Sequence, residues 1–191
     1  MEKKAPKKPQ GWLVLFLVSL VAALALAGTN EMTKGAIAQR ALEAADAARK
    51  TVLNNADTFE QLQVPEGIGV DNGYRGLKDG KAVGIVAQST VKGYGGEIEI
   101  VVGMDLSGAV TGISVGGPSF SETAGLGDKA KEPAFTNQFK GLVLPATLAD
   151  NVDAISGATI TSNAVVLGVN QAGTYLSSVI DSSESDNSQG K

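Results

Sequence analysis

The sequence predicts an α+β protein, in which a twisted, mostly antiparallel sheet packs with helices after one N-terminal transmembrane helix. Three observations predict this class. Residues 11–28 form an uncharged apolar run. Residues 98–104 alternate and are followed by a turn and a second extended run at 109–115, and apolar residues recur at steps of three and four after Asn163. The first pattern suits a membrane span, the second a half-buried strand and its partner, and the third a helix with one buried face. Helices packed against a sheet would bury its apolar face.

Residues 1–10 are predicted to be a basic cytoplasmic leader and residues 11–28 a membrane anchor. Four lysines precede the 18-residue uncharged run, and a bilayer span needs about 17–25 residues. The residues Ala25 to Ala27, before Gly28, also fit a signal-peptide cleavage site, so a cleaved signal and a retained anchor are both open. In either case the positive-inside rule places the lysines in the cytoplasm and the rest of the chain outside it.

Residues 29–65 are predicted to be a helical stalk or packing helix. Between Glu31 and Leu53, Ile37, Ala41 and Val52 fall on one face of an alanine-rich stretch, a pattern typical of an amphipathic helix with high intrinsic propensity. The residues that follow, 54–65, are expected to form a loop with a short helical turn.

Residues 66–180 are predicted to form one extracytoplasmic domain whose first part is rich in strands. Turn signals lie at 71–73, 79–80 and 105–108, and extended runs cover 82–88, 98–104 and 109–115. The run 98–104 alternates and 109–115 is expected to be its antiparallel partner. The Ser-, Asp- and Asn-rich residues 181–191 are expected to be a disordered tail.

Composition excludes several kinds of chemistry. The chain has no cysteine and no histidine, which removes the usual zinc sites, cysteine-ligated iron–sulfur clusters, His-ligated haem, Ser-His-Asp triads and flavin attachment through His or Cys. The net charge is −4 although the first ten residues are basic, so the exported part is acidic and is not expected to bind nucleic acid.

The most informative stretch is Asp153 to Ser162, which leads into the C-terminal helical pattern. A helix is expected to begin near residue 161 or 162, because residues 161–163 are all competent N-caps. Gly157 and Ala158 allow close approach to the main chain, and Thr159 offers a hydroxyl near a helix N-terminus, which favours a negative charge such as a phosphate. A ligand-free turn with capping hydroxyls fits the same residues.

The second informative stretch is the loop 119–127. Two glycines around one leucine can bring main-chain amides and an apolar side chain against a flat aromatic ring, while two polar side chains supply further contacts. The predicted ring-lining residues are Glu122, Thr123, Gly125, Leu126 and Gly127. A connecting loop without a ligand has the same composition.

The run Asp-x-x-Ser-Gly-Ala-Thr at 153–159 resembles the flavinylation motif of the FMN-binding domains in two protein families. These are the G subunit of Rnf-type ferredoxin:NAD oxidoreductases and the C subunit of sodium-translocating NADH:quinone reductases. The resemblance implies FMN attached through a phosphoester to Thr159 by an FAD-dependent FMN transferase. The frame that the transferase recognises would be Asp153, Ser156, Gly157 and Ala158.

Further positions match the same family, so that the resemblance spans about residues 80–175. The loop at 122–127 resembles the family's Glu-Thr-Pro-Gly-Leu-Gly segment, and 92–96 and 135–139 match other segments. Two departures stand out: Ala124 replaces the usual Pro, and Ser121 stands where many relatives have His. Lys129 or Lys131 is expected to stabilise reduced, anionic flavin.

The resemblance implies an electron-transfer flavoprotein subunit of a membrane complex that couples ferredoxin:NAD electron transfer to ion translocation. Its partners would be the other membrane subunits and the FMN transferase, with no catalytic residue, no metal and no stand-alone catalysis. The family keeps its N-terminal anchor, which favours retention here. Two alternatives stay open: the C subunit of a quinone reductase, and a non-redox extracellular binding module with an unmodified Thr159.

Overall fold

The computed structural model describes residues 11–189 of the chain, so the predicted leader at 1–10 and the last two residues of the predicted tail lie outside it. Contacts divide the chain into two units, Met1–Glu43 and Ala44–Lys191. The first unit holds most of α1, which runs from Gly11 to Val52 without interruption. Part of α1 is long and apolar enough to cross a membrane. The anchor and the helical stretch predicted after it therefore belong to one helix.

The second unit is built on a five-stranded sheet in which each strand pairs antiparallel with the next along the chain. The strands are β1 (Thr58–Leu62), β2 (Asn72–Lys78), β3 (Lys81–Lys92), β4 (Glu97–Asp105) and β5 (Val110–Gly116). The predicted α+β class with a mostly antiparallel sheet is confirmed. The β4–β5 pairing is the one expected from the alternating run at 98–104.

Two predictions in this part of the chain are wrong. Residues 54–65 were expected to be a loop with a helical turn, yet they contain β1, an edge strand that pairs with β2 through its backbone and buries only part of Phe59 and Leu62. Residues 71–73 were expected to form a turn, yet β2 begins at Asn72. Gly73 is needed there for space, because a Cβ atom on it would lie 2.4 Å from the Tyr175 hydroxyl oxygen.

The turn predicted at 79–80 is confirmed. Asp79 and Gly80 join β2 to β3 with φ angles of 50° and 74°. A two-residue hairpin requires positive φ at both positions when its turn follows the twist of the strands. Asp and Gly are among the few residues that adopt this conformation readily.

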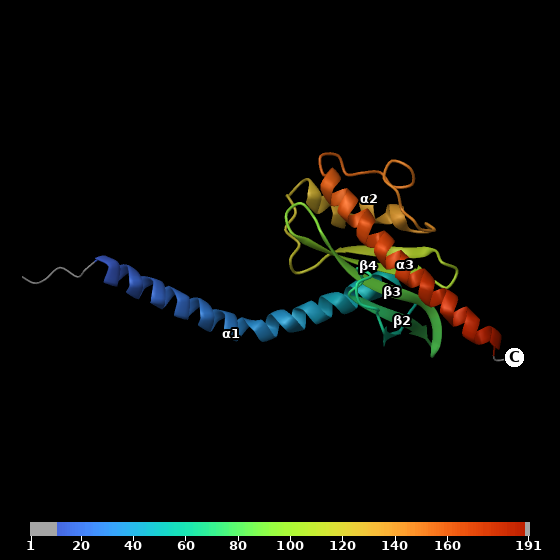
Figure 1. Ribbon diagram of the computed structural model, residues 1–191, viewed down its shortest axis with the longest axis horizontal. Coiled ribbons are helices and arrows are strands. Elements are labelled where there is room, and N and C mark those ends of the chain that lie inside the picture. The colour runs from blue at the N-terminus through green and yellow to red at the C-terminus, as the bar shows by residue number, and fades with distance from the viewer. Residues whose placement is uncertain (1–10, 190–191) are drawn as a thin grey trace, which may run out of the picture. The chain divides into compact units, whose positions relative to one another are not determined.

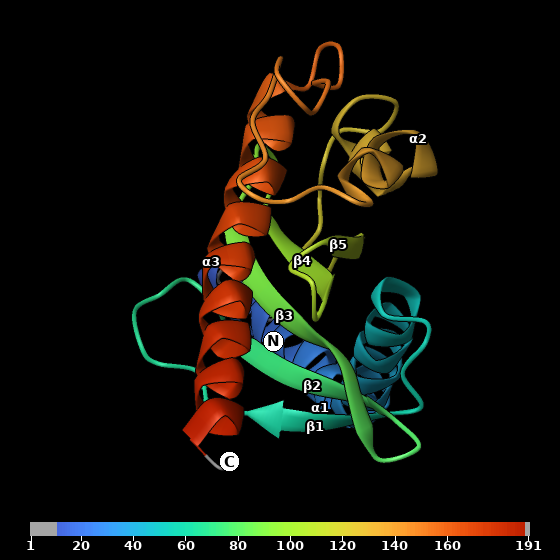
Figure 2. The ribbon, with the colours of Figure 1, turned by 90° about the vertical axis from the view of Figure 1, so that its right-hand side faces the viewer.

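Two helices bury the two faces of the sheet (Figure 2). On one face lies α3, Thr159–Gln189, whose Val165, Val169 and Leu176 are fully buried against residues such as Ile98 and Ile100. On the other face, Val52 and Leu53 at the end of α1 form a smaller core with Val86 and Val101. Neighbouring positions along β3 and β4 therefore serve different cores, as the period of two requires.

The helix α3 differs from its prediction at both ends. It begins at Thr159, ahead of the expected residues 161 and 162, and it continues to Gln189, past the residue where a disordered tail was expected to begin. Once a helix is nucleated, each further residue adds one backbone hydrogen bond, and polar residues form this bond as well as apolar ones. The polar residues after 180 can therefore continue the helix. Figure 1 shows α3 running along the strands with the short helix α2 (Pro133–Thr136) near its N-terminal end.

The segment between β5 and α3 covers the remaining end of the main core. It holds the 3₁₀ helices η1 (Gly127–Lys131) and η2 (Asn137–Phe139) on either side of α2. Phe135 and Phe139 are buried and meet edge to face, with ring centroids 5.6 Å apart. This packing holds the start of η1 beside the N-terminus of α3, where the functional stretches meet.

Candidate functional site

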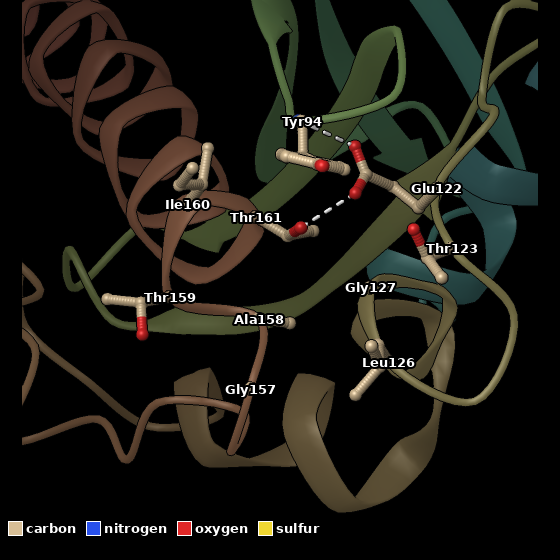
Figure 3. Close-up of a pocket in the computed structure, with 10 residues that line it drawn as sticks. All are labelled: Tyr94, Glu122, Thr123, Leu126, Gly127, Gly157, Ala158, Thr159, Ile160 and Thr161. Atoms are coloured by element: carbon tan, nitrogen blue, oxygen red, sulfur yellow. Dashed lines mark hydrogen bonds between the residues drawn. The ribbon is translucent and has the colours of Figure 1, made fainter.

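A pocket of about 500 Å³ lies where three segments meet: the turn between β3 and β4, the loop that enters η1, and the first turn of α3 (Figure 3). Its lining residues are Tyr94, Glu122, Thr123, Leu126, Gly127, Gly157, Ala158, Thr159, Ile160 and Thr161. A volume of this size is in the usual range for small-molecule sites, about 300–1,000 Å³. The two stretches singled out in the sequence therefore share one cavity.

Most of the predicted site residues line this pocket, but several do not. Asp153, Ser156 and Gly125 are absent from the lining, as are both lysines proposed to stabilise reduced flavin. The Lys131 ammonium lies 3.6 Å above the centre of the Phe120 ring instead. Among the lining residues Glu122 is therefore the sole charged side chain.

Three lining residues were not predicted from the sequence. Tyr94 lies in the 92–96 segment, which resembles a family segment but carried no predicted role. Ile160 and Thr161 also line the pocket, and both belong to the first turn of α3, which begins earlier than expected. If the sequence had predicted Ala158 as the N-cap of α3, Ile160 and Thr161 would have been placed in the first turn of the helix, beside Thr159.

Gly125 shapes the loop. The Leu126 N–H donates to the Thr123 carbonyl at 3.1 Å, which closes a four-residue turn, and Gly125 has a φ of 77° at its third position. That position of a type II turn requires positive φ, and the second position, here Ala124, is where Pro is favoured. The turn forms with Ala at the place where the related families carry Pro.

The turn before α3 also depends on one glycine. The Ala158 N–H donates to the Ile155 carbonyl at 2.9 Å, and Gly157 between them has a φ of 77°. Upstream, the Asp153 backbone is held by the Gln138 side-chain amide, which accepts from the Asp153 N–H at 2.8 Å and donates to its carbonyl. The Asp153 side chain itself is exposed.

No side chain of the described residues caps the N-terminus of α3. The Ser162 N–H donates to the Ala158 carbonyl at 3.0 Å, so Ala158 occupies the N-cap position, and alanine has no side-chain oxygen to offer. Within the described residues, the N–H groups of 159–161 find no acceptor. Unpaired amides and the helix dipole together favour an anion at this place.

The hydroxyl groups around this helix end fall into two kinds. Those of Thr161 and Ser162 are buried and bonded: Thr161 donates to Glu122 Oε2 at 2.7 Å, and Ser162 donates to the Ala158 carbonyl and accepts from the Ile155 N–H. Those of Thr159 and Thr123 belong to exposed residues and make no hydrogen bond within the described part of the chain. Of these two, Thr159 alone lies at the start of α3.

Both oxygens of the Glu122 carboxylate accept hydrogen bonds from protein donors. Oε1 accepts from the backbone N–H groups of Tyr94 and Gly95 at 2.9 and 3.1 Å, and Oε2 accepts from Thr161. Figure 3 shows the side chain reaching from its loop toward Tyr94 and Thr161. Glu122 lines the pocket, but its oxygens already bind three groups of the chain.

Similarity to known proteins covers the same segments. A family model described as an FMN-binding domain matches residues 93–174. The chain is 34% identical to the G subunit of the Na(+)-translocating ferredoxin:NAD(+) oxidoreductase complex of Acetobacterium woodii, and the match covers 84% of this chain and 87% of that protein. It is 30% identical to the G subunit of the proton-translocating ferredoxin:NAD(+) oxidoreductase complex of Clostridium ljungdahlii, where the match covers 83% and 85%.

Among solved structures, the chain is similar to the C subunit of the Na(+)-translocating NADH-quinone reductase from Parabacteroides distasonis. The sequences are 24% identical, the match covers 55% of this chain and 60% of that chain, and the TM-score is 0.44.

Proposed function

The chain belongs to the family of G subunits of ion-translocating ferredoxin:NAD oxidoreductase complexes. We propose that it is a membrane-anchored flavoprotein with FMN attached covalently to Thr159. Bound FMN would supply the redox chemistry, and the chain would bind and orient it. The observation that carries the proposal is the exposed Thr159 hydroxyl, which lines the pocket beside three backbone amides; among the described residues neither the hydroxyl nor these amides have a hydrogen-bond partner.

The competing hydroxyls are less suited to attachment. Those of Thr161 and Ser162 are buried, with exposed fractions of 1% and 0%. Both already donate hydrogen bonds, to Glu122 and to the Ala158 carbonyl. Thr123 has an exposed hydroxyl in the same pocket, but its carbonyl already accepts from the Leu126 and Asp128 N–H groups at the start of η1, and it does not lie at the N-terminus of α3. The free amides at 159–161 would meet the phosphate of a flavin attached at Thr159.

The phosphate would be oriented by the helix and held by the covalent bond. A phosphodiester keeps one negative charge, and the charge effect at an exposed helix end is typically about 0.3–1 kcal/mol. That energy cannot retain a cofactor outside the cell, where a released flavin would be diluted away. A phosphoester to Thr159 removes this difficulty.

Attachment would need a separate enzyme. With FAD as donor, a bond forms between Thr159 Oγ1 and the FMN phosphorus, the pyrophosphate bond breaks, and AMP leaves while the hydroxyl proton is removed. Among the lining residues Glu122 is the sole carboxylate, and its oxygens already accept three hydrogen bonds. This supports an FAD-dependent FMN transferase as a partner, with Asp153 and Ser156 on the exposed loop that such an enzyme could reach.

The flavin ring would lie against the apolar part of the pocket. Tyr94, Leu126 and Ile160 are exposed by 69%, 42% and 58% although they are large and apolar. An aromatic ring placed among them would bury surface that is now in contact with water. Thr123 and the Gly127 backbone lie beside Leu126 and would complete this side of the site (Figure 3).

The apolar part of α1 would anchor the protein in the cell membrane and be retained. Its orientation would place the N-terminus in the cytoplasm and the second unit outside, because the lysines precede the span. The other membrane subunits of the complex would be its partners, and the chain would pass electrons among them. Of the two alternatives, the quinone-reductase subunit would also carry a flavin, whereas a non-redox module would leave Thr159 unmodified.

The test is the mass of the chain purified from cells that also express the transferase. We expect the mass of the chain to increase by that of one FMN less one water. We also expect visible flavin absorbance after denaturation, and peptide fragmentation that places the flavin on Thr159. Thr159→Ala should abolish all three. Thr123→Ala is the matched control, because it removes the other exposed threonine hydroxyl of the pocket, and it should keep the flavin. Flavin found on Thr123, Thr161 or Ser162 would contradict the assignment.

A further inference from the structure

We propose that Glu122 is a positioning residue: its carboxylate ties together the three segments that wall the pocket, and so gives the pocket its shape before any flavin is attached. The consequence for the cofactor rests on the proposed function above. The tie itself is a property of the chain and can be tested without flavin.

The contacts of Glu122 join parts of the chain that are far apart in sequence. From its place in the loop before η1, the side chain accepts from the Tyr94 and Gly95 N–H groups in the β3–β4 turn and from the Thr161 hydroxyl in the first turn of α3. Hydrogen bonds to an ionised acceptor are about twice as strong as neutral ones. A single carboxylate therefore fixes the relative positions of the three walls.

The backbone around the carboxylate is packed too closely for other side chains. A Cβ atom on Gly93 would lie 2.3 Å from Glu122 Oε1, and one on Gly127 would lie 2.5 Å from Oε2. In the same turn, a Cβ atom on Gly95 would lie 1.9 Å from the Ser121 carbonyl oxygen. These glycines let the three segments close around Glu122, which is a structural need that exists without a ligand.

An amide replaces this carboxylate only in part. In Glu122→Gln, the single oxygen can still accept from the two backbone N–H groups, and the NH₂ group can donate to the Thr161 hydroxyl, which is also able to accept. These bonds lack the charge that makes hydrogen bonds to a carboxylate about twice as strong. The variant is nearly the same size as the original side chain, so it weakens the tie with little change in packing.

The Glu122 charge would also act on the flavin. It is the sole charged side chain among the lining residues, and a fixed negative charge near a redox group disfavours the addition of an electron. Removing it should raise the reduction potential of the attached FMN. A role limited to holding the fold would not require a shift in that direction.

Amide hydrogen exchange of the flavin-free full-length protein in detergent tests the tie. In Glu122→Gln, we expect exchange at Tyr94 and Gly95 to become about threefold to tenfold faster, the factor expected when a hydrogen bond to a charged acceptor becomes a neutral one of about half the strength. Glu97→Gln is the matched control: it removes an exposed carboxylate from the same hairpin and should leave exchange at both amides unchanged.

A second pair of variants approaches the tie from α3. Thr161→Val removes one donor and keeps the charge, so exchange at Tyr94 and Gly95 should quicken by a smaller factor, and Thr161→Ser should restore it. This pair decides the matter if Glu122→Gln does not fold. Unchanged exchange at both amides in Glu122→Gln, or in Thr161→Val where only that pair folds, would overturn the proposal.

The redox arm uses the flavin-loaded protein. Glu122→Gln should raise the reduction potential, whereas Thr161→Val, which keeps the charge, should shift it less. Equal potentials in wild type and Glu122→Gln would overturn the electrostatic part. Flavin attached elsewhere than Thr159 would contradict the proposed function, while the exchange result on the flavin-free chain would still decide the role of Glu122.

Discussion

The α-carbon of Gly103 faces the backbone of Val52 so closely that a Cβ atom on residue 103 would lie 2.5 Å from the Val52 carbonyl oxygen. That oxygen also accepts a hydrogen bond from the Thr111 hydroxyl on the next strand. The end of α1 is thus seated directly on β4 and β5, where a glycine leaves room for it.

Gly103→Ala should therefore destabilise the second unit. The new methyl group would collide with backbone, which cannot move aside as a flexible side chain can, so we expect a loss of about 1–3 kcal/mol in the free energy of unfolding. Chemical denaturation monitored by circular dichroism measures it. Gly112→Ala is the control, because Gly112 pairs with Gly103 but its Cβ would find its nearest neighbour at 3.5 Å. Equal losses in the two variants would contradict this explanation.

Truncation should show where the folded domain begins. A chain starting at Ala44 keeps Val52 and Leu53, which are 1% and 0% exposed, and should fold as a soluble protein. A chain starting at Glu66, the predicted domain boundary, lacks both residues and β1. Burying a large aliphatic side chain contributes about 1.5–3 kcal/mol, so this fragment should lose cooperative thermal unfolding. A cooperative transition in the shorter fragment would show that the end of α1 is dispensable.

Much of the fold could be predicted because several of its elements follow from patterns among residues that are close together in the sequence. The alternation through Ile98 and Ile100 identified β4, and Asp79-Gly80 identified a hairpin, since both depend on neighbouring residues. The strand β1 could not be found in this way. Its residues are half polar, and what makes them a strand is the set of hydrogen bonds to β2, a partner that lies outside any local window.

The site shows the same division. The resemblance to the FMN-binding family predicted Thr159 and Leu126 as site residues, and both line one pocket in the structure. The role of Glu122 as a bond acceptor between segments could not be predicted, because its donors Tyr94 and Thr161 lie 28 and 39 residues away. The start of α3 was placed late because Thr161, Ser162 and Asn163 are all good capping residues. Their side chains instead bind Glu122 and the carbonyl groups of Ala158 and Thr159.

The two threonines of the first turn of α3 should respond differently to loss of their hydroxyl groups. Thr161→Ala removes a buried donor to a carboxylate and should cost about 1–3 kcal/mol of unfolding free energy. Thr159→Ala removes an exposed hydroxyl with no partner among the described residues and should change stability by less than about 0.5 kcal/mol. Thermal unfolding of the flavin-free chains compares them. A large loss in Thr159→Ala would reveal a structural role that its exposure does not suggest.

Ala124→Pro should stabilise the loop that enters η1. The second position of this turn suits proline, and restricting the unfolded chain at a compatible site raises stability by about 0.4–1 kcal/mol. Ala149→Pro is the opposite control, because Ala149 has a φ of 65° and its N–H donates to the Val152 carbonyl at 2.9 Å, both of which proline forbids. Thermal unfolding should rise in the first variant and fall in the second. A fall in both would mean that the 123–126 turn does not accept proline.

Glu99 should make the folded domain less stable as the pH rises. Burial, followed by the nearby Asp71 carboxylate, raises the pKa of Glu99 above its usual value of 4.5, although a hydrogen bond from Gln88 opposes the shift. The folded chain then binds this proton more tightly than the unfolded chain. The Glu99 contribution to the free energy of unfolding therefore declines as the pH rises from below 4.5 through the raised pKa, and is constant above it.

Glu99→Gln should remove this loss, because the amide stays neutral and keeps an oxygen that can accept from Gln88. We expect the variant to be more stable than wild type at pH 7, with the difference vanishing below about pH 4. Asp71→Asn should recover part of the same gain, since the Asp71 carboxylate is the second cause of the shift. Urea denaturation of wild type, Glu99→Gln and Asp71→Asn between pH 3 and 8 measures the differences in the free energy of unfolding. The other acidic residues titrate in all three chains, so their effects cancel in these differences. A Glu99→Gln chain that is less stable than wild type at pH 7 would show that the carboxylate contributes more through Gln88 than burial takes away.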